Sequence, residues 1–269
     1  MKLFCRRAAY YVTIHQRNRD LPNMLLMHGF MGSSDAFQPL VEQIKPICNP
    51  ITIDLLGHGK TSAVSDPKRF DAASQVQDLM SILSRLQFSN LFLYGYSMGG
   101  RLAQNLAANS RSTFKGLILE STHCGIHSDE SRKKRRTVDE QRAKNILDDF
   151  KSFTKYWASV PLFESPERAG KVDYLSIIQS QSPDSMAASL RGFGAGKAPY
   201  LCNDITQIDL PIGLIAGESD EKYVDKMREM HHLFADSTLS VIAGAGHRVH
   251  SDQPKQIVTF LTNFFEHYG

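Results

Sequence analysis

The sequence predicts an α/β fold, built on a mostly parallel central sheet with helices on both faces. In residues 1–120, short apolar segments alternate with segments of helical periodicity, which is the pattern of parallel strands joined by crossover helices. Residues 121–203 differ, because they are charged and helical, are broken by prolines and contain no convincing strand. The strand pattern then returns, so the simplest organisation is an α/β core interrupted by a helical insertion.

Seven apolar segments are the expected strands: Tyr10–Ile14, Met24–His28, Ile51–Asp54, Leu91–Gly95, Leu117–Glu120, Ile212–Ala216 and Leu239–Ile242. Helices are expected near residues 37–44, 72–86, 99–108 and 254–267. We therefore divide the chain into an α/β core of residues 1–120 and 204–269 and a helical cap of residues 121–203. Ligands of such sheets bind at the carboxyl ends of the strands, so a cap at that end forms a wall of the pocket.

Composition argues against several classes of protein. The formal net charge of +3 is too small to indicate a nucleic-acid partner by itself. No apolar run has the length of a membrane span, and the N-terminal residues lack the apolar segment of a secretory signal. The cysteines, Cys5, Cys48, Cys124 and Cys202, are widely spaced, so we expect free thiols of a reducing compartment rather than a disulfide framework or a zinc site. A cytoplasmic protein follows.

Residues 95–99 read Gly-Tyr-Ser-Met-Gly and stand between an apolar strand and a helix of small residues. The pattern G-x-S-x-G in this position is typical of the nucleophile elbow of α/β hydrolases, in which a serine is held on a sharp turn. Glycine is needed on both sides because the turn has no room for side chains. The helix N-terminus that follows favours an oxyanion. Ser97 is therefore the predicted catalytic residue.

A serine of this kind needs a base and an acid that orients the base, in the chain order Ser, Asp or Glu, His. His247 lies in a loop between the last strand and the closing helix, and an imidazole with a pKa of about 6.5 accepts and returns a proton at neutral pH. Asp220 closely follows the strand Ile212–Ala216, and Glu218, two residues earlier, is the nearest rival. We predict a catalytic triad of Ser97, His247 and Asp220.

Two backbone N–H groups are needed to stabilise an oxyanion. One is expected from Met98, the residue after the serine, and the other from Phe30, in the loop that follows the second predicted strand. His28 and His58 lie in loops near the predicted site, and we interpret both as structural residues that help to shape the pocket.

Arg101 is the first indication of the substrate. It lies one helical turn after Ser97, on the same face of a helix that is otherwise small and apolar. A guanidinium in such a place is costly unless an anion meets it, which favours an anionic small molecule over a neutral ester. The alternative is a side chain that reaches solvent or pairs with a carboxylate of the core.

The segments HGFMGSS, DLLGHGKT, GYSMGGR, LILEST, GESDEKYV and GAGHRVH resemble the α/β-hydrolase superfamily over nearly the whole chain. More narrowly, they resemble the 2-succinyl-6-hydroxy-2,4-cyclohexadiene-1-carboxylate synthases of menaquinone biosynthesis. The resemblance implies a lyase that eliminates pyruvate from 2-succinyl-5-enolpyruvyl-6-hydroxy-3-cyclohexene-1-carboxylate, with the triad as general base and with no metal or organic cofactor. The alternatives are a carboxylesterase or other serine hydrolase acting on small esters with the same triad, and a hydrolase-fold protein that binds without catalysis.

The resemblance also implies the residues that bind the substrate. Tyr96 and Arg101 match positions of the family beside and after the serine. Arg135 matches an R-x-x-x-D pattern of the cap, with the neighbouring Arg136 as the alternative. Trp157 matches a cap tryptophan of the family, and packing within the cap is its other interpretation.

One family feature is missing from this chain. Members usually carry another cap arginine where this sequence has Ile177 and Ile178. Arg168 or Arg191 is the candidate to replace it. If neither does, the binding of carboxylates is expected to be weaker.

Overall fold

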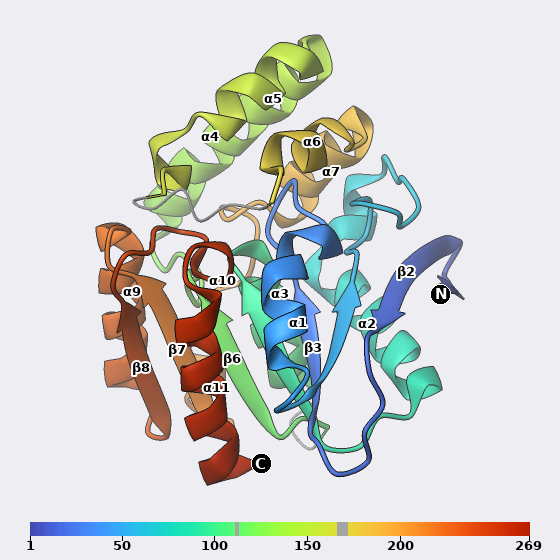
Figure 1. The fold of residues 1–269 in the computed structure, drawn as a ribbon. Coiled ribbons are helices and arrows are strands. Elements are labelled where there is room, and N and C mark those ends of the chain that lie inside the picture. Colours follow the sequence, from blue (N-terminus) through green and yellow to red (C-terminus); the bar gives the residue numbers. More distant parts are fainter. Residues whose placement is uncertain (111–112, 166–171) are drawn as a thin grey trace.

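The computed structural model describes residues 1–110, 113–165 and 172–269 (Figure 1). Its strands are β1 (Lys2–Cys5), β2 (Ala8–Ile14), β3 (Asn23–Met27), β4 (Asn49–Ile53), β5 (Leu91–Tyr96), β6 (Gly116–Glu120), β7 (Ile212–Gly217) and β8 (Ser237–Ile242). They form one sheet in the order β1-β2-β4-β3-β5-β6-β7-β8. β2 runs antiparallel to β1 and β4, and all other neighbours are parallel. The predicted α/β fold is confirmed.

Helices cover both faces of the sheet. One face carries α2 (Ala72–Leu86), α3 (Met98–Asn109), α8 (Cys202–Ile205) and α9 (Glu221–Leu233). The other carries α1 (Gln38–Ile44), α10 (Val249–Asp252) and α11 (Pro254–Tyr268). Two short 3-10 helices, η1 (Ser34–Phe37) and η2 (Pro67–Phe70), lie in the connections. Within the described ranges, no helix is long and apolar enough to cross a membrane.

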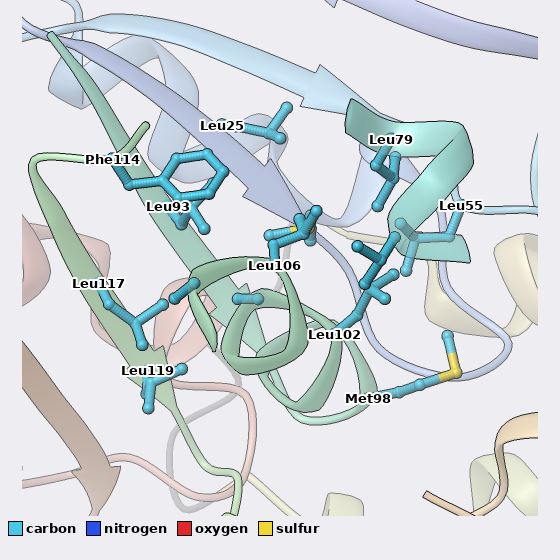
Figure 2. Close-up of a cluster of buried hydrophobic side chains, with 14 of the residues drawn as sticks. Leu25, Leu55, Leu79, Leu93, Met98, Leu102, Leu106, Phe114, Leu117 and Leu119 are labelled. Atoms are coloured by element: carbon cyan, nitrogen blue, oxygen red, sulfur yellow. The ribbon is translucent and has the colours of Figure 1, made fainter. Parts of the chain in front are cut away.

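The strands are apolar on both sides, so their side chains alternate between two cores. In β5, Leu91 and Leu93 face the side of α2 and α3, whereas Phe92 and Tyr94 face α1 and α11. Figure 2 shows the first of these cores, where leucines from several strands pack against α3. Full burial of a leucine side chain contributes about 2 kcal/mol. This packing fixes α3, and with it the turn that holds Ser97.

Between β6 and β7 the chain forms the cap helices α4 (Asp129–Asp148), α5 (Phe150–Ala158), η3 (Pro161–Phe163), α6 (Tyr174–Gln179) and α7 (Pro183–Phe193). Figure 1 shows them grouped beyond the end of the sheet at which the parallel strands finish. α4 packs along α7, and α5 packs against α6. A small apolar cluster joins these helices to one another and to Met31, in the loop after β3. The domain boundaries at residues 121 and 203 stay a prediction.

The cap divides into separate helices for local reasons. The side chains of Ser128, Asp149, Asp173 and Ser182 each accept a hydrogen bond from a backbone amide in the first turn of α4, α5, α6 and α7, respectively. Such capping satisfies amides that have no partner within the helix. Polar capping residues therefore start four separate helices, which agrees with the lack of a strand pattern in this segment.

Strand β1 is missing from the predicted strands. It pairs with β2 through a tight turn at Arg6 and Arg7, whose φ angles are 45° and 67°. Hairpin turns with positive φ usually carry Asn or Gly, so two arginines give no turn signal. The other seven strands agree with the predicted ones to within two residues at each end.

The prediction of free thiols is wrong for two of the four cysteines. Cys124 and Cys202 form a disulfide, with Cα atoms 5.0 Å apart and a sequence separation of 78 residues. The amide of Leu201 also donates to the carbonyl of Cys124, at 2.6 Å. Cys5 and Cys48 are free and buried. The two ends of the insertion thus meet beside the sheet, and spacing along the chain gives no signal of that meeting.

Candidate active site

The turn at Ser97 is tight and strained. Ser97 has φ 52° and ψ −108°, a conformation that residues with a side chain rarely adopt and that occurs at functional sites. A Cβ atom at Gly99 would overlap the carbonyl of Met27, and one at Gly95 would overlap the backbone of Gly100. Glycine is therefore required on both sides of the serine, as the sequence predicts.

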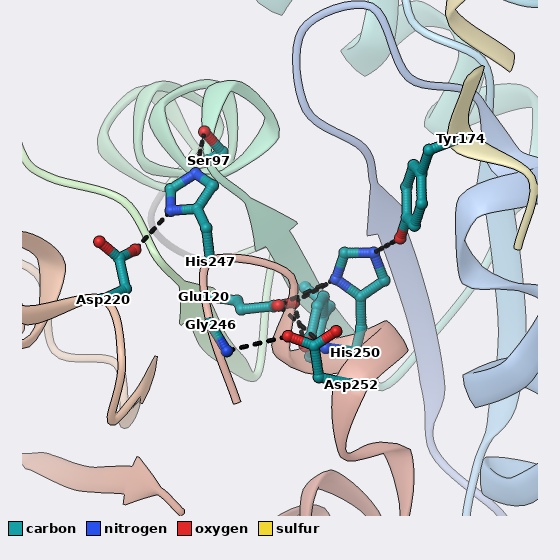
Figure 3. Close-up of polar contacts among 9 residues, drawn as sticks. Ser97, Glu120, Tyr174, Asp220, Gly246, His247, His250 and Asp252 are labelled. Atoms are coloured by element: carbon teal, nitrogen blue, oxygen red, sulfur yellow. Dashed lines mark hydrogen bonds and ion pairs between the residues drawn. The ribbon is translucent and has the colours of Figure 1, made fainter. Parts of the chain in front are cut away.

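The three predicted triad residues lie in hydrogen-bonding order (Figure 3). Nε2 of His247 is 3.3 Å from Oγ of Ser97, and Nδ1 of His247 is 2.6 Å from Oδ2 of Asp220. His247 and Asp220 are buried, whereas the rival Glu218 is exposed. Because the Asp220 carboxylate accepts the Nδ1 proton, Nε2 presents a lone pair to the serine hydroxyl. The arrangement is that of a serine activated by a buried base.

Phe30 and Met98, the predicted oxyanion donors, are next to the same cavity as Ser97. Both residues line it. In the part of the chain that the structure describes, neither amide donates a hydrogen bond. Two N–H donors are thus available to an oxygen atom of a ligand placed above the serine.

The cavity above Ser97 is small and strongly cationic. Its volume is about 130 Å³, and its walls include side chains of α4, α5 and α7 from the cap. Four cationic side chains line it, namely Arg101, Arg135, Arg142 and Lys222. Its lining has no carboxylate among the described residues. Most other lining residues are aromatic or aliphatic, so the cavity suits a compact anion with an apolar body.

Arg101 is buried and incompletely paired. Its side chain donates to the carbonyl of Phe193 at 3.4 Å and lies 5.6 Å from that ring. Its Nε has no hydrogen-bond partner among the described residues. Burial, and the like charge of Arg135, lower the pKa of Arg101 to about 10, so the guanidinium is charged at neutral pH. A buried charge with an unused donor favours an anion in the cavity.

Two arginines of α4 share one carboxylate. Nε of Arg135 donates to Asp139 at 2.8 Å, and Nη1 of Arg142 lies 3.8 Å from the same oxygen. The Arg142 guanidinium is also 5.2 Å from the ring of Trp157. Burial and the neighbouring Arg135 lower the pKa of Arg142. Among the described residues, one carboxylate therefore balances one of these two positive charges and leaves the other without a counter-ion.

The other arginines considered for substrate binding, where the structure describes them, do not line the cavity. Arg136 donates to the carbonyl of Gly196 at 3.4 Å and does not line the cavity. Arg191 makes two hydrogen bonds to Glu140, at 2.9 and 2.8 Å, and is likewise absent from the lining. Arg168 lies outside the described residues. We call the four cationic side chains that line the cavity, Arg101, Arg135, Arg142 and Lys222, the cationic wall. Arg136 and Arg191 thus do not contribute to it.

Arg142 and Lys222 are cavity residues that the sequence motifs do not single out. Arg142 follows Arg135 by seven residues, or two helical turns, so the two side chains share a face of α4. That spacing is a signal that could have identified it. Lys222 is at the start of α9, two residues after Asp220. Its position in the cavity depends on how α9 meets the cap, and a single sequence gives no sign of that.

Tyr96 and Trp157 both line the cavity, as the family pattern implies. The ring of Tyr96 packs against the ring of His247, with centroids 5.4 Å apart. Trp157 meets Phe30 edge-on at 5.6 Å. Trp157 also belongs to the apolar cluster of the cap, which agrees with its interpretation as a packing residue, while its contact with substrate stays a prediction.

His28 and His58 are outside the cavity lining. Nε2 of His28 accepts the amide proton of Leu55 at 3.0 Å, and Nδ1 of His58 lies 2.8 Å from the carbonyl of Leu56. Burial and the neighbouring His28 lower the pKa of His58 to about 3, so that ring is neutral. Both histidines fix the loops beneath the site.

Comparison with known proteins shows the family to which the chain belongs. The model of the α/β hydrolase fold family matches residues 22–254. A Bacillus subtilis protein named "Putative 2-succinyl-6-hydroxy-2,4-cyclohexadiene-1-carboxylate synthase" is 36% identical over 246 residues, which are 90% of this chain and 89% of that protein. The synthase of the same name from Klebsiella pneumoniae is 28% identical over 241 residues, covering 89% and 92%. The structure of MenH from S. aureus has a TM-score of 0.89 and 30% identity, covering 96% and 98%.

Proposed function

Because the chain belongs to the family of α/β hydrolases that includes the 2-succinyl-6-hydroxy-2,4-cyclohexadiene-1-carboxylate synthases, we propose that it is a carbon–oxygen lyase. It eliminates pyruvate from 2-succinyl-5-enolpyruvyl-6-hydroxy-3-cyclohexene-1-carboxylate. The observation that carries this proposal is the cavity over Ser97, whose described lining has four cations and no carboxylate. A neutral ester has no group that needs these charges, whereas a substrate with several carboxylates does.

In the proposed reaction, Ser97 acts as a base rather than as a nucleophile. Asp220 holds the Nδ1 proton of His247, so Nε2 takes the hydroxyl proton of Ser97. The serine oxygen then removes the proton from the carbon beside the succinyl ketone of the substrate. The ketone makes this C–H bond acidic, which brings it within reach of general-base catalysis.

The electron pair of the broken C–H bond forms an enolate. Its oxygen accepts hydrogen bonds from the amides of Phe30 and Met98, which stabilise the negative charge as it develops. Collapse of the enolate forms a double bond from the deprotonated ring carbon to its neighbour, moves the existing ring double bond by one position and breaks the C–O bond to the enolpyruvyl group. The leaving group departs as the enolate of pyruvate and takes up the proton. This route needs neither an acyl-enzyme nor a metal.

The cationic wall orients the substrate for this step. Arg101 lies in the first turn of α3, directly after Ser97. Arg135 and Arg142 line the cavity from α4 of the cap, and Lys222 lines it from α9. A planar guanidinium binds a carboxylate through two parallel hydrogen bonds, so carboxylates held from several sides fix the position of the acidic carbon. Fixed positioning of this kind accounts for a large share of catalysis by enzymes.

The test is pyruvate release from the authentic substrate, coupled to lactate dehydrogenase, by the wild type and by Ser97→Ala. We expect steady release by the wild type and a loss of about a thousandfold in the variant. Small neutral esters serve as the comparison, because an esterase hydrolyses them rapidly and is insensitive to Arg101→Ala. No pyruvate above blank from folded wild type would refute the lyase, and rapid ester hydrolysis in the same preparation would favour the serine hydrolase.

A further inference from the structure

The turn that carries Phe30, one of the two predicted oxyanion donors, begins beside Ser97. A Cβ atom at Gly29 would lie 3.5 Å from Cβ of Ser97, so the turn packs directly against the serine. The amide of Gly32 donates to the carbonyl of Gly29 at 3.1 Å and closes the turn, with Phe30 and Met31 as its central residues. This hydrogen bond leaves the N–H of Phe30 unused.

His28, the residue before the turn, holds the carbonyl of Gly29. Nε2 of His28 accepts the amide proton of Leu55 at 3.0 Å, so Nδ1 carries the ring proton and donates it to the Gly29 carbonyl at 2.8 Å. The ring is fully buried, and burial lowers the pKa of His28. The ring is therefore neutral at neutral pH, and each nitrogen keeps its role.

Fixing the oxygen of Gly29 also fixes the direction of the Phe30 amide. The carbonyl of Gly29 and the N–H of Phe30 belong to one peptide unit, which is planar and trans, so the two groups point to opposite sides. A rotation of this peptide that moved the N–H would break the hydrogen bonds from His28 and Gly32 to the Gly29 oxygen. The direction of the predicted donor is thus set from behind, by groups on the oxygen side of its peptide.

The third position of the turn is strained. Met31 has φ 57°, in the left-handed region, and this position of a turn usually carries glycine or asparagine when φ is positive. The Met31 side chain is buried in the apolar cluster that joins the cap helices. Packing therefore stabilises a backbone conformation that a methionine otherwise avoids.

Gln181, between α6 and α7, holds the far end of the turn. Its Nε2 donates to the carbonyl of Gly32 at 3.3 Å and to that of Ile177 at 2.9 Å. Its Oε1 accepts the amide proton of Gly59 at 3.0 Å. The side chain is buried, and these three hydrogen bonds fix its position. Gln181 therefore joins the turn to the loop after β4.

We propose that His28 and Gln181 are positioning residues that fix the Phe30 amide for stabilisation of the enolate oxygen. Neither belongs to the described lining of the cavity, so both act through the turn and not on the substrate. His28 holds the peptide that carries the amide, and Gln181 holds the turn that this peptide begins. The identity of the oxyanion rests on the proposed function, but the same amide serves any reaction of Ser97 that places negative charge on an oxygen.

Two substitutions of His28 separate positioning from stability. In His28→Asn the side-chain amide occupies the position of Nδ1 and donates to the Gly29 carbonyl. In His28→Gln the longer side chain reaches Leu55, and its oxygen accepts that amide proton as Nε2 does. Each variant loses one buried hydrogen bond, so urea unfolding should show a similar loss of stability in both. Only His28→Gln releases the carbonyl of Gly29.

Further variants test the amide and the far end of the turn. Phe30→Pro removes the N–H at a turn position that accepts proline, and Phe30→Ala is its reference, because it removes the same side chain and keeps the amide. Gln181→Met removes the three hydrogen bonds at nearly constant side-chain length. Gln179→Met is the matched control, because Gln179 is the exposed last residue of α6.

We would measure kcat and KM for pyruvate release and, separately, the rate at which a fluorophosphonate modifies Ser97, since its phosphonyl oxygen takes the place of the oxyanion. Phe30→Pro should lower both rates about a hundredfold relative to Phe30→Ala. His28→Gln should lower them at least about tenfold, and His28→Asn should recover most of that loss. Gln181→Met should lower them about three- to tenfold, whereas Gln179→Met behaves as the wild type. KM of the His28 and Gln181 variants stays within about twofold, because no substrate contact is removed.

The double variant His28→Gln/Phe30→Pro should be no slower than Phe30→Pro, because the group that His28 positions is then absent. Losses that multiply in this double variant would overturn the proposal. Equal losses in His28→Gln and His28→Asn would also overturn it, because His28 would then act through stability alone. If a His28 variant does not fold, Gln181→Met, alone and combined with Phe30→Pro, decides the proposal in the same way.

Two other results separate the parts of the proposal. Rates of Gln181→Met that match those of Gln179→Met would refute the role of Gln181, and a rise in KM at constant kcat would refute positioning for either residue. A wild type that is phosphonylated but releases no pyruvate refutes the lyase function alone, and the phosphonylation rates then decide whether His28 and Gln181 position the amide.

Discussion

At the sheet end of the site the polar groups satisfy one another, whereas on the cap side they do not. Ser97, His247 and Asp220 form a closed set of hydrogen bonds on turns fixed by the core. Arg135 and Arg142 share a single carboxylate and face the cavity together with Arg101 and Lys222. The proposed base is therefore complete without a ligand, while the cationic wall is complete only with an anion. The proposed chemistry therefore belongs to the core, whereas recognition is shared between Arg101 and Lys222 of the core and Arg135 and Arg142 of the cap.

The largest effect is expected from a change at the sheet end. Asp220→Asn removes the charge that holds the Nδ1 proton of His247, so the ring can turn an N–H toward Ser97. We expect kcat to fall about a thousandfold with little change in KM, because the cationic wall is intact. Steady-state pyruvate release measures both parameters. Glu218→Gln, at the exposed residue near Asp220, is the control. Equal losses of kcat in Asp220→Asn and Glu218→Gln would contradict the assignment of Asp220 as the orienting acid.

The next effect concerns the covalent link between the two ends of the insertion. The Cys124–Cys202 disulfide closes a long loop, with a sequence separation of 78 residues, so its reduction should lower the free energy of unfolding by about 2–4 kcal/mol. Urea unfolding with and without reductant measures the difference. The double variant Cys124→Ser/Cys202→Ser should not respond to reductant. Peptide mapping without reductant that finds no peptide linked through these two cysteines would contradict the disulfide.

A smaller effect is expected from the cationic wall. Arg101→Ala should lower kcat/KM by about ten- to a hundredfold, mainly through KM, because a buried charged hydrogen bond to the substrate is lost. Arg191→Ala is the matched control, since Arg191 is paired with Glu140 away from the cavity, and its kinetics should stay within twofold of the wild type. Similar losses in both variants would show that general surface charge, and not this wall, attracts the substrate.

The smallest effect is a change with pH. Burial lowers the pKa of Arg101 to about 10, so kcat/KM should decline as the pH rises through that value and the empty cavity loses a positive charge. A bound carboxylate favours the charged form, so kcat should decline at a higher pH than kcat/KM. In Arg101→Lys, burial acts on an ammonium group, and the decline should begin at lower pH. If kcat/KM of the wild type and of Arg101→Lys declined at the same pH, titration of residue 101 would not be the cause of the decline.

The sheet end could be predicted because its signals are local. Ser97, Asp220 and His247 each follow a strand within a few residues, and parallel strands bring their carboxyl ends to one edge of the sheet. Position along the chain therefore translates directly into position in space. The geometry agrees with the predicted triad, while the catalytic roles stay a proposal.

The cap could be predicted only in part, because its contacts depend on how separate helices pack. Arg142 and Arg191 lie on two helices that pack side by side, yet one lines the cavity and the other pairs with Glu140. Charge and helical spacing alone do not distinguish them. The disulfide between Cys124 and Cys202 could likewise not be predicted from the sequence, because the two cysteines are far apart along the chain.

The meeting of Cys124 and Cys202 also bears on how such proteins diversify. Their Cα atoms are 5.0 Å apart, so the chain leaves the α/β core after β6 and returns to it at α8 at nearly the same point. The parallel pairing of β6 with β7 does not depend on what lies between these two points. Insertions whose ends coincide are tolerated because they leave the scaffold undisturbed. Evolution can thus replace the cap, with its share of the substrate-binding residues, as a single cassette and keep an inherited proton-transfer apparatus.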